Sequence, residues 1–151
     1  MKRKNSKSIG KPKSQLPIVF YCDGSGARPD GKGSAIAWFR EDTGREHAET
    51  VDGLTNNEAE YRAIISALQS ALPGSTVKIF SDAQLVIYQI CGVYRVNDPE
   101  LAVLRNSVND AVLNRNLNVE FIWIPRGQNR ADRLLRRKEP FSSSDKPGAA
   151  A

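Results

Sequence analysis

The chain has 151 residues, 40% of them hydrophobic and 26% charged, and a formal net charge of +5. This length fits one domain with a sizeable core, and the composition is ordinary for a soluble globular protein. No apolar run approaches the length of a membrane span, and the apolar segment after the basic start contains Pro17 and leads into Asp23, unlike a signal peptide. We therefore expect a cytoplasmic protein without membrane contact.

The excess positive charge lies at the N-terminus. Residues 1–13 carry six lysines and arginines and no acid, and removing those six leaves 16 basic against 17 acidic residues. We expect residues 1–15 to form a basic flexible arm, which either holds a nucleic-acid phosphate backbone or only aids solubility. Residues 139–151 are rich in Ser, Pro, Gly and Ala and are expected to be a disordered tail. Residues 16–138 are left as the folded domain.

The first expected strand, Ile18–Cys22, is apolar on successive residues and is followed by glycines. Such a strand is typically covered on both faces, so we expect it to be central in a sheet. At its end lies Asp23, which either caps a turn or is a carboxylate held there for chemistry. Cys22 and Cys91 lie in apolar segments without metal-ligand spacing, so both are expected to be buried and reduced.

Two further strands and a helix follow. The residue pattern predicts strands at residues 34–40 and 45–51, joined by a turn at residues 41–44. Thr55 and Glu58 match a capping box, in which the threonine caps a helix and the glutamate reaches back. The predicted helix carries apolar residues at helical spacing as far as residue 72, and the Pro-Gly pair after it ends the helix.

Strands and helices alternate in the second half of the chain. We expect strands at residues 76–80 and 118–125, and helices at residues 83–91, 99–115 and 130–138. The Asp-Pro pair before residue 100 supplies a cap and a favourable first helical residue. A three-stranded meander followed by this alternation predicts an α/β fold, with a mixed five-stranded sheet and helices on both faces.

Three more acids, like Asp23, have either a structural role, such as capping a helix, or a role in chemistry. Glu60 is one turn inside the first helix, on its apolar side. Asp82 ends the fourth strand, where it can cap the next helix, and Asp132 is in the first turn of the last helix. If they meet Asp23 at one rim of the sheet, repulsion raises at least one carboxyl pKa unless a cation intervenes. Hard oxygen ligands of this kind suit Mg²⁺ or Mn²⁺ rather than zinc.

Four motifs in this order resemble type 1 ribonuclease H. They are Asp23-Gly24-Ser25-Gly26, Thr55-Asn56-Asn57-Glu58-Ala59-Glu60-Tyr61, Ser81-Asp82-Ala83-Gln84-Leu85-Val86 and Ala131-Asp132-Arg133-Leu134. The resemblance covers residues 18–137, and the order of elements predicted above agrees with the fold of that family. It implies a ribonuclease-H-like catalytic domain at residues 16–138. Such a domain hydrolyses the RNA strand of RNA/DNA hybrids and leaves 3′-hydroxyl and 5′-phosphate ends.

The resemblance also implies the catalytic and metal-binding residues, which are Asp23, Glu60, Asp82 and Asp132. The cofactor it implies is a pair of Mg²⁺ ions, with Mn²⁺ as a possible substitute, roughly 3.5–4 Å apart as in other two-metal sites. Asp23, on the most rigid strand, is the natural bridging ligand. No side-chain nucleophile is required, and the one histidine, His47, is expected in mid-strand, far in sequence from these acids.

The implied substrate-binding residues are Gly24, Ser25, Thr55, Asn56, Asn57 and Gln84. Amide side chains can donate to and accept from the 2′-hydroxyl that distinguishes RNA from DNA, although the asparagines can also serve only to cap the helix. By the same resemblance, Thr55 would hold a phosphate of the DNA strand. Arginines around the last acid either engage phosphates or form a solvated helix face; they are Arg126, Arg130, Arg133, Arg136 and Arg137.

The chain departs from the family pattern at three places. Residues 91–97 form a short link where many relatives carry a basic, tryptophan-containing protrusion, and residues 125–128 lack the mobile loop histidine. Asn129 precedes Asp132 by three residues instead of four, which could displace that acid. Two alternatives stay open: a silent relative that only grips hybrids, and a nuclease of this fold that acts on DNA junctions or in transposition. We expect a monomer that belongs to the compact branch of the family.

Overall fold

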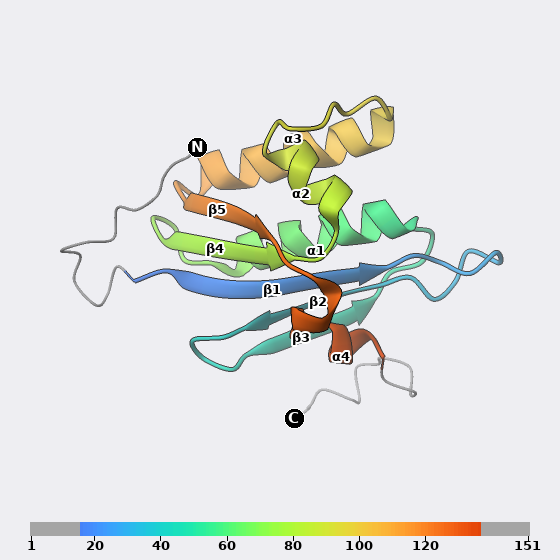
Figure 1. Cartoon of the computed structure of the whole chain (residues 1–151), viewed down its shortest axis with the longest axis horizontal. Coiled ribbons are helices and arrows are strands. Elements are labelled where there is room, and N and C mark those ends of the chain that lie inside the picture. Colours follow the sequence, from blue (N-terminus) through green and yellow to red (C-terminus); the bar gives the residue numbers. More distant parts are fainter. Residues whose placement is uncertain (1–15, 137–151) are drawn as a thin grey trace.

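The computed structural model describes residues 16–136, and its sheet has five strands in the order β3-β2-β1-β4-β5 (Figure 1). The strands are β1 (Ile18–Ser25), β2 (Ala35–Arg40), β3 (Glu46–Thr50), β4 (Thr76–Ser81) and β5 (Asn118–Trp123). β1 pairs antiparallel with β2 and parallel with β4, so the sheet is mixed. The prediction that the first strand is central is confirmed.

β1 continues beyond its expected end at Cys22. The parallel ladder with β4 ends at the pair Cys22 and Ser81, but the antiparallel ladder with β2 continues to the pair Ser25 and Ala35. The expected strand end was therefore wrong. Asp23 lies inside the strand because β2 holds the backbone through the residues that were expected to turn.

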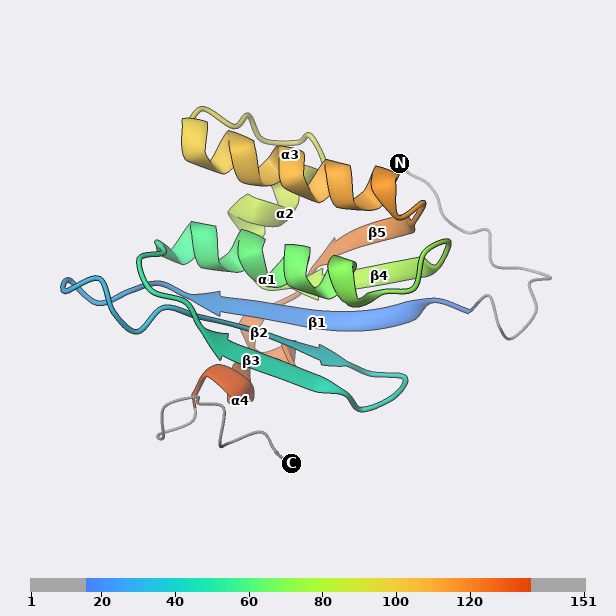
Figure 2. The ribbon, with the colours of Figure 1, turned by 180° about the vertical axis from the view of Figure 1, so that it is seen from behind.

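Helices cover both faces of the sheet, as the sequence predicted (Figures 1 and 2). α1 (Asn56–Ser70), α2 (Gln84–Ile90) and α3 (Pro99–Asn114) lie on one side, and the short α4 (Asp132–Leu135) lies on the other. Side chains alternate along β1 and β2 between these two sides. Phe20 belongs to the core under α1, whereas Leu134 of α4 packs with Ala37 and Phe39 of β2.

The capping box predicted at the start of α1 is present. The Thr55 hydroxyl accepts a hydrogen bond from the Glu58 backbone N–H (3.1 Å), and Glu58 Oε1 accepts one from the Thr55 N–H (2.9 Å). These bonds satisfy two of the backbone donors that a helix start leaves unpaired. Glu58 is thus the capping acid of α1. The next acid in this helix, Glu60, takes no part in the cap, and its carboxylate accepts a hydrogen bond from Gly24 of β1.

The main core lies between the sheet and the three-helix side. Its large, fully buried side chains include Phe20, Tyr61, Ile64, Leu68 and Ile79. Burying an aliphatic or aromatic side chain of this size stabilises the fold by roughly 1.5–3 kcal/mol. β1, β4 and α1 are therefore held firmly against one another, which makes their ends a rigid support for functional side chains.

Two details differ from the sequence predictions. Cys22 is buried as expected, but the prediction that Cys91 is buried was wrong: Cys91 is exposed at the C-cap position directly after α2. The final helix covers only part of the expected span 130–138, and residues 137–138, the arm 1–15 and the tail 139–151 lie outside the described residues. Within residues 16–136, no helix has the length and apolar character needed to span a bilayer.

Candidate active site

Three carboxylates from distant parts of the sequence meet where β1 and β4 end. Asp23 lies in β1, Glu60 in α1, and Asp82 directly after β4. Each offers one oxygen atom, and these three oxygens lie within 4.8 Å of one another. Asp23 is buried and the other two are half-buried, so the cluster is largely removed from water.

Gly24 allows α1 to approach β1 closely enough for Glu60 to reach the cluster. A Cβ atom at Gly24 would lie 2.3 Å from the Ala59 backbone carbonyl carbon and 2.5 Å from the Glu60 backbone nitrogen, so only glycine fits. The Gly24 N–H donates to Glu60 Oε1 and to Asp23 Oδ1, both at 3.0 Å. One backbone amide thus holds two of the carboxylates side by side.

Asp82 does not cap the helix that follows it. The N-cap of α2 is Ala83, which makes no side-chain cap, and the Ala83 N–H donates to the Ser81 hydroxyl (3.1 Å) rather than to Asp82. The Asp82 carbonyl instead accepts a hydrogen bond from the Trp123 indole N–H (3.2 Å), and its carboxylate accepts one from Asn129 (3.3 Å). The ordinary capping role is therefore absent, and the carboxylate faces the cluster.

Asn129 joins three parts of the site. Its side-chain amide donates to the Cys22 carbonyl of β1 (2.8 Å) as well as to Asp82, and its side-chain oxygen accepts from the Ala131 N–H (3.0 Å). Asn129 is buried, so these bonds are shielded from water. The turn before α4 is consequently fixed to the strand ends, and the shortened spacing does not carry Asp132 away.

Asp132 lines the same cavity as the three clustered acids. The cavity has a volume of about 350 Å³ and is lined by Asp23, Gly24, Ser25, Asn56, Glu60, Asp82, Arg126, Asp132, Leu135 and Arg136. Asp132 is 7% exposed, yet its oxygens fall outside the 4.8 Å set formed by the other three. The structure therefore brings all four predicted acids to one cavity, three of them in direct proximity.

Burial and mutual repulsion disturb the ionisation of these acids. Burial, helped by the charges of Asp82 and Asp132, raises the pKa of Asp23 to about 7. Burial and the charges of Asp23 and Asp82 raise the pKa of Glu60 to about 9. The pKa of Asp82 is also raised, chiefly by burial, although the Asn129 hydrogen bond acts in the opposite direction. At neutral pH the cluster therefore favours binding protons or a cation.

Two arginines lie at the rim of the cavity. Arg136 Nη2 is 2.8 Å from one Asp132 oxygen, and Arg126 Nη2 is 3.9 Å from the other. Their side chains are 72% and 81% exposed, so neither fills the space between the buried carboxylates. The predicted arginine cluster is divided, because Arg130 and Arg133 instead pair with Glu41 and Glu46 of the β2–β3 hairpin. Arg137 lies outside the described residues.

The predicted substrate-binding residues fall into two groups. Gly24, Ser25 and Asn56 line the cavity, and Asn56 Oδ1 accepts a hydrogen bond from the Gly26 N–H (2.7 Å). Thr55, Asn57 and Gln84 are exposed and do not line the cavity. His47 lies in β3, stacked against Trp38 and bonded to Glu49 (2.7 Å), far from the cavity in the sheet order.

Asn129, Arg126 and Arg136 complete the site. Sequence reasoning placed Asn129 only as a doubtful neighbour of Asp132, and the arginines only within a larger basic cluster. The spacing of Asp132 and Arg136, four residues apart, is the usual signal for an ion pair on one helix face. No comparable signal links Asn129 to Asp82, because that contact joins segments 47 residues apart.

The donor set fits a divalent cation. Three carboxylate oxygens within 4.8 Å, partly buried and with raised pKa values, are hard ligands whose repulsion a cation relieves. Among residues 16–136 no other group of three His, Cys, Asp or Glu side chains meets this geometry. A cation-assisted reaction of an anionic substrate is the chemistry that such a cavity supports.

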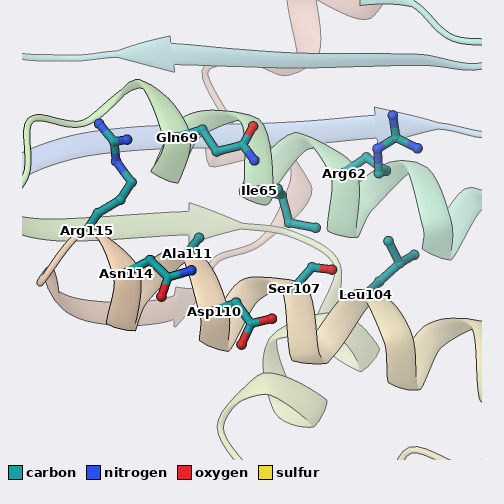
Figure 3. A pocket seen from close by; sticks show the side chains of 9 residues that line it. All are labelled: Arg62, Ile65, Gln69, Leu104, Ser107, Asp110, Ala111, Asn114 and Arg115. Atoms are coloured by element: carbon teal, nitrogen blue, oxygen red, sulfur yellow. The ribbon is translucent and has the colours of Figure 1, made fainter.

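A larger hollow, of about 530 Å³, lies elsewhere between α1 and α3 (Figure 3). It is lined by Arg62, Ile65, Gln69, Leu104, Ser107, Asp110, Ala111, Asn114 and Arg115. It holds one carboxylate, Asp110, and the Arg115 guanidinium donates to the Ala71 carbonyl (3.1 Å from Nε). Size alone therefore does not identify the reactive site, because this hollow lacks a set of convergent ionisable groups.

Comparison with known proteins gives a consistent result. A family model described as RNase H matches residues 15–138. The bifunctional protein Rv2228c of Mycobacterium tuberculosis is 31% identical over 128 residues, which is 79% of this chain and 34% of that protein. The chain thus spans about a third of the length of the curated relatives at this level of similarity.

Solved structures match over a larger share of both chains. RNase H1 from the archaeon Halobacterium salinarum has a TM-score of 0.67 and 30% identity, over 79% of this chain and 94% of that one. LC11-RNase H1, solved in complex with an RNA/DNA hybrid, has a TM-score of 0.68 and 32% identity, over 78% of this chain and 92% of that one. The range matched by the family model, residues 15–138, includes all the residues that line the cavity.

Proposed function

Because the chain belongs to the RNase H family, we propose that it is a metal-dependent endonuclease that hydrolyses the RNA strand of RNA/DNA hybrids. Its products are RNA fragments with 3′-hydroxyl and 5′-phosphate ends. The observation that carries this proposal is the cluster of Asp23, Glu60 and Asp82, whose oxygens lie within 4.8 Å of one another in a partly buried cavity.

The metal ligands in this proposal are Asp23, Glu60, Asp82 and Asp132. Asp23 would be the ligand shared by two Mg²⁺ ions, because one of its oxygens lies within 4.8 Å of oxygens of Glu60 and Asp82, and the charge of Asp132 also raises its pKa. Divalent ions bound there supply a nucleophilic water and neutralise charge at the phosphate. Asn129 and the Gly24 N–H keep the carboxylates oriented, and Mn²⁺ is a possible substitute.

Substrate recognition in this proposal uses residues beside the acids. The Gly24–Ser25 backbone and Asn56 line the cavity, and the exposed Asn57 and Gln84 extend the surface around it. Amide groups at these positions can both donate to and accept from a 2′-hydroxyl. Thr55, at the start of α1, is assigned to a DNA-strand phosphate. The arginines at the rim, Arg126 and Arg136, add positive charge where a phosphate backbone would pass.

Three broader features belong to the same proposal. The protein acts in the cytoplasm as a monomer, and residues 16–138 form the catalytic domain. The basic residues 1–15 strengthen hybrid binding through phosphate contacts without reading sequence. Each of these is testable by size measurement, by fractionation and by removing the arm.

The proposal is tested with a hybrid that carries a labelled RNA strand. With Mg²⁺ the wild-type protein is expected to release short RNA fragments with 3′-hydroxyl ends, and EDTA or Asp82→Asn is expected to abolish them. Asp110→Asn is the matched control, since it removes an equivalent charge from an exposed acid of α3. An intact RNA strand with both Mg²⁺ and Mn²⁺ would refute the proposal. Binding without cleavage would identify a silent relative, and cleavage of an all-DNA duplex instead would identify a different nuclease.

A further inference from the structure

α4, which carries Asp132, is held in part by the Asn129 hydrogen bonds in the turn before it and by the packing of Leu134 and Leu135 on the sheet. The helix spans only Asp132–Leu135, and its N-cap, Ala131, makes no side-chain cap. Its fully buried side chain is Leu134, which packs with Ala37 and Phe39 on the face of the sheet opposite the main core. A single turn of helix is not stable by itself, so other contacts must hold it against the sheet.

Two arginines that flank Asp132 provide such contacts. The Arg130 guanidinium lies over the Phe39 ring, 4.6 Å from its centroid, and its Nη1 is 2.9 Å from Glu41 Oε2. The Arg133 guanidinium lies 5.5 Å from the centroid of the same ring, and its Nη2 is 2.5 Å from Glu46 Oε2. Phe39 is therefore contacted by both guanidinium groups. The two glutamates belong to the hairpin formed by β2 and β3, at the ends of those strands.

These contacts differ from those of Arg126 and Arg136, which reach Asp132 itself. Arg130 and Arg133 face the sheet, and neither lines the cavity. Phe39 is 7% exposed and also packs against Leu134, so one side chain receives the apolar and the cationic contacts of the last helix. The β2–β3 hairpin is thereby connected to the position of the fourth carboxylate.

We propose that Phe39, Arg130 and Arg133 are positioning residues that hold Asp132 at the metal cavity, with Glu41 and Glu46 as the partners of the arginines. The inference rests on the proposed function in one respect, because it takes Asp132 to be a metal ligand. The proposal gives the β2–β3 hairpin, through Phe39, Glu41 and Glu46, a role in cation binding, although the hairpin contributes no metal ligand.

The size of the effect follows from the strength of these contacts. A cation–π contact at an exposed site and an exposed ion pair are each weak, but both arginines make one of each with the hairpin. Removing both arginines is expected to increase the fraction of time that α4 spends away from the sheet about tenfold. Cation affinity then falls by the fraction of molecules in which Asp132 has left the cavity.

The test compares three variants with a matched control. Arg130→Gln with Arg133→Gln removes both guanidinium groups, whose side chains are 50% and 56% exposed, so the core is untouched. Phe39→Leu removes the ring that both guanidinium groups contact. Phe39→Tyr keeps an aromatic ring at this position and should retain the wild-type behaviour. The control is Arg40→Gln, which breaks the Arg40–Asp42 ion pair (2.8 Å) on the same hairpin without involving α4.

Two readouts need no catalysis. Amide hydrogen exchange of Leu134, whose N–H bonds the Ala131 carbonyl (3.0 Å), reports whether α4 stays on the sheet. Calorimetric titration with Mn²⁺ alone reports cation binding. In the double arginine variant we expect exchange protection of Leu134 to fall about tenfold, and we expect the weaker Mn²⁺ dissociation constant to rise by the same factor by which the fraction of molecules with α4 on the sheet falls. The exchange of Ala59 in α1 should not change.

The outcomes separate this inference from the proposed function. Unchanged protection of Leu134 in the double variant would overturn the inference, and so would a Mn²⁺ dissociation constant that does not follow the fraction of molecules with α4 on the sheet. An equal effect of Arg40→Gln would also overturn it, because the effect would then follow from charge alone. If the wild-type protein bound no Mn²⁺ and cleaved no hybrid, the proposed function would fail, whatever the exchange of Leu134 showed.

Discussion

The side-chain amide of Asn129 donates a hydrogen bond of 3.3 Å to the carboxylate of Asp82. The same amide donates to the Cys22 carbonyl at 2.8 Å, and both Asn129 and Cys22 are buried. One buried side chain thus connects the end of β4, the middle of β1 and the turn that leads into α4. The orientation of two of the candidate ligands, Asp82 and Asp132, depends on this connection.

Replacing Asn129 by alanine should therefore weaken both the fold and the site. We expect Asn129→Ala to lower the free energy of unfolding by about 1–3 kcal/mol, because the buried Cys22 carbonyl loses its donor. Mn²⁺ affinity should fall as well, since Asp82 is no longer oriented. Urea unfolding and calorimetry measure the two effects. Asn106→Ala, an exposed change on α3, is the control, and equal stability of the two variants would contradict the prediction.

The raised carboxyl pKa values predict how stability depends on pH. The pKa of Asp23 is about 7 and that of Glu60 about 9 in the folded protein, against about 4 in an unfolded chain. Between pH 4 and these values the folded state binds more protons than the unfolded state, so the free energy of unfolding falls as pH rises. One proton held over two pH units corresponds to about 3 kcal/mol.

We therefore expect the protein in EDTA to be less stable at pH 8 than at pH 5. Urea unfolding at the two pH values measures the difference, and saturating Mg²⁺ should reduce it, because a bound cation replaces the protons. Glu60→Gln should flatten the dependence, since glutamine neither ionises nor repels Asp23. A metal-free protein that gains stability from pH 5 to pH 8 would show that these acids ionise without a cost in the folded state.

Gly24 gives a test of the close contact between β1 and α1. A Cβ at this position would lie 2.3 Å from the Ala59 backbone carbonyl carbon. This clash can be relieved only if β1 or α1 moves. We expect Gly24→Ala to lower the free energy of unfolding by about 3 kcal/mol or more and to displace Glu60. Gly127→Ala is the control, because no atom lies within 4 Å of its added Cβ. Similar stability of the two variants by urea unfolding would mean that α1 can move away from β1 at little cost.

Much of the fold was predictable because local signals agree with the final arrangement. The Thr55–Glu58 capping box, the Asp98 cap and the apolar stripe of α1 all mark element ends or faces that tertiary packing preserves. The end of β1 was not predictable in the same way. Asp23-Gly24 is a common turn signal, but pairing with β2 keeps these residues in the strand, and the glycine serves the approach of α1.

The candidate site was predictable as a set of acids but not as a set of contacts. Asp23, Glu60, Asp82 and Asp132 follow from motifs, whereas the Asn129–Asp82 bond joins segments that no local pattern relates. The division of the arginines also depends on tertiary structure. Arg133 reaches the hairpin and Arg136 reaches Asp132, although only three residues separate them, because the direction of each side chain is set by one short turn of helix.

Gln84 separates substrate recognition from folding. It is exposed at the start of α2, outside the cavity lining, and lies two residues from Asp82. We expect Gln84→Ala to leave the free energy of unfolding within about 0.5 kcal/mol of the wild type, as is usual for a surface substitution. Affinity for an RNA/DNA hybrid in Ca²⁺ should fall severalfold, with little change for an all-DNA duplex, because a contact to the 2′-hydroxyl is lost. Equal losses on both duplexes, measured by fluorescence anisotropy, would assign Gln84 to the phosphate backbone instead.

Arg136 should affect cation binding and hybrid binding in opposite directions. Its guanidinium lies 2.8 Å from an Asp132 oxygen, where it competes with a metal ion for that carboxylate. Its side chain is 72% exposed, so solvent screening limits the competition, and we expect Arg136→Gln to tighten Mn²⁺ binding only about two- to threefold. A hybrid bound in Ca²⁺ should be held more weakly and with a smaller dependence on salt, since one phosphate contact is lost. Arg45→Gln is the matched control, because it removes the same charge beside Trp38, away from the cavity. Weaker Mn²⁺ binding in Arg136→Gln would mean that the arginine orients Asp132 for the metal instead of competing with it.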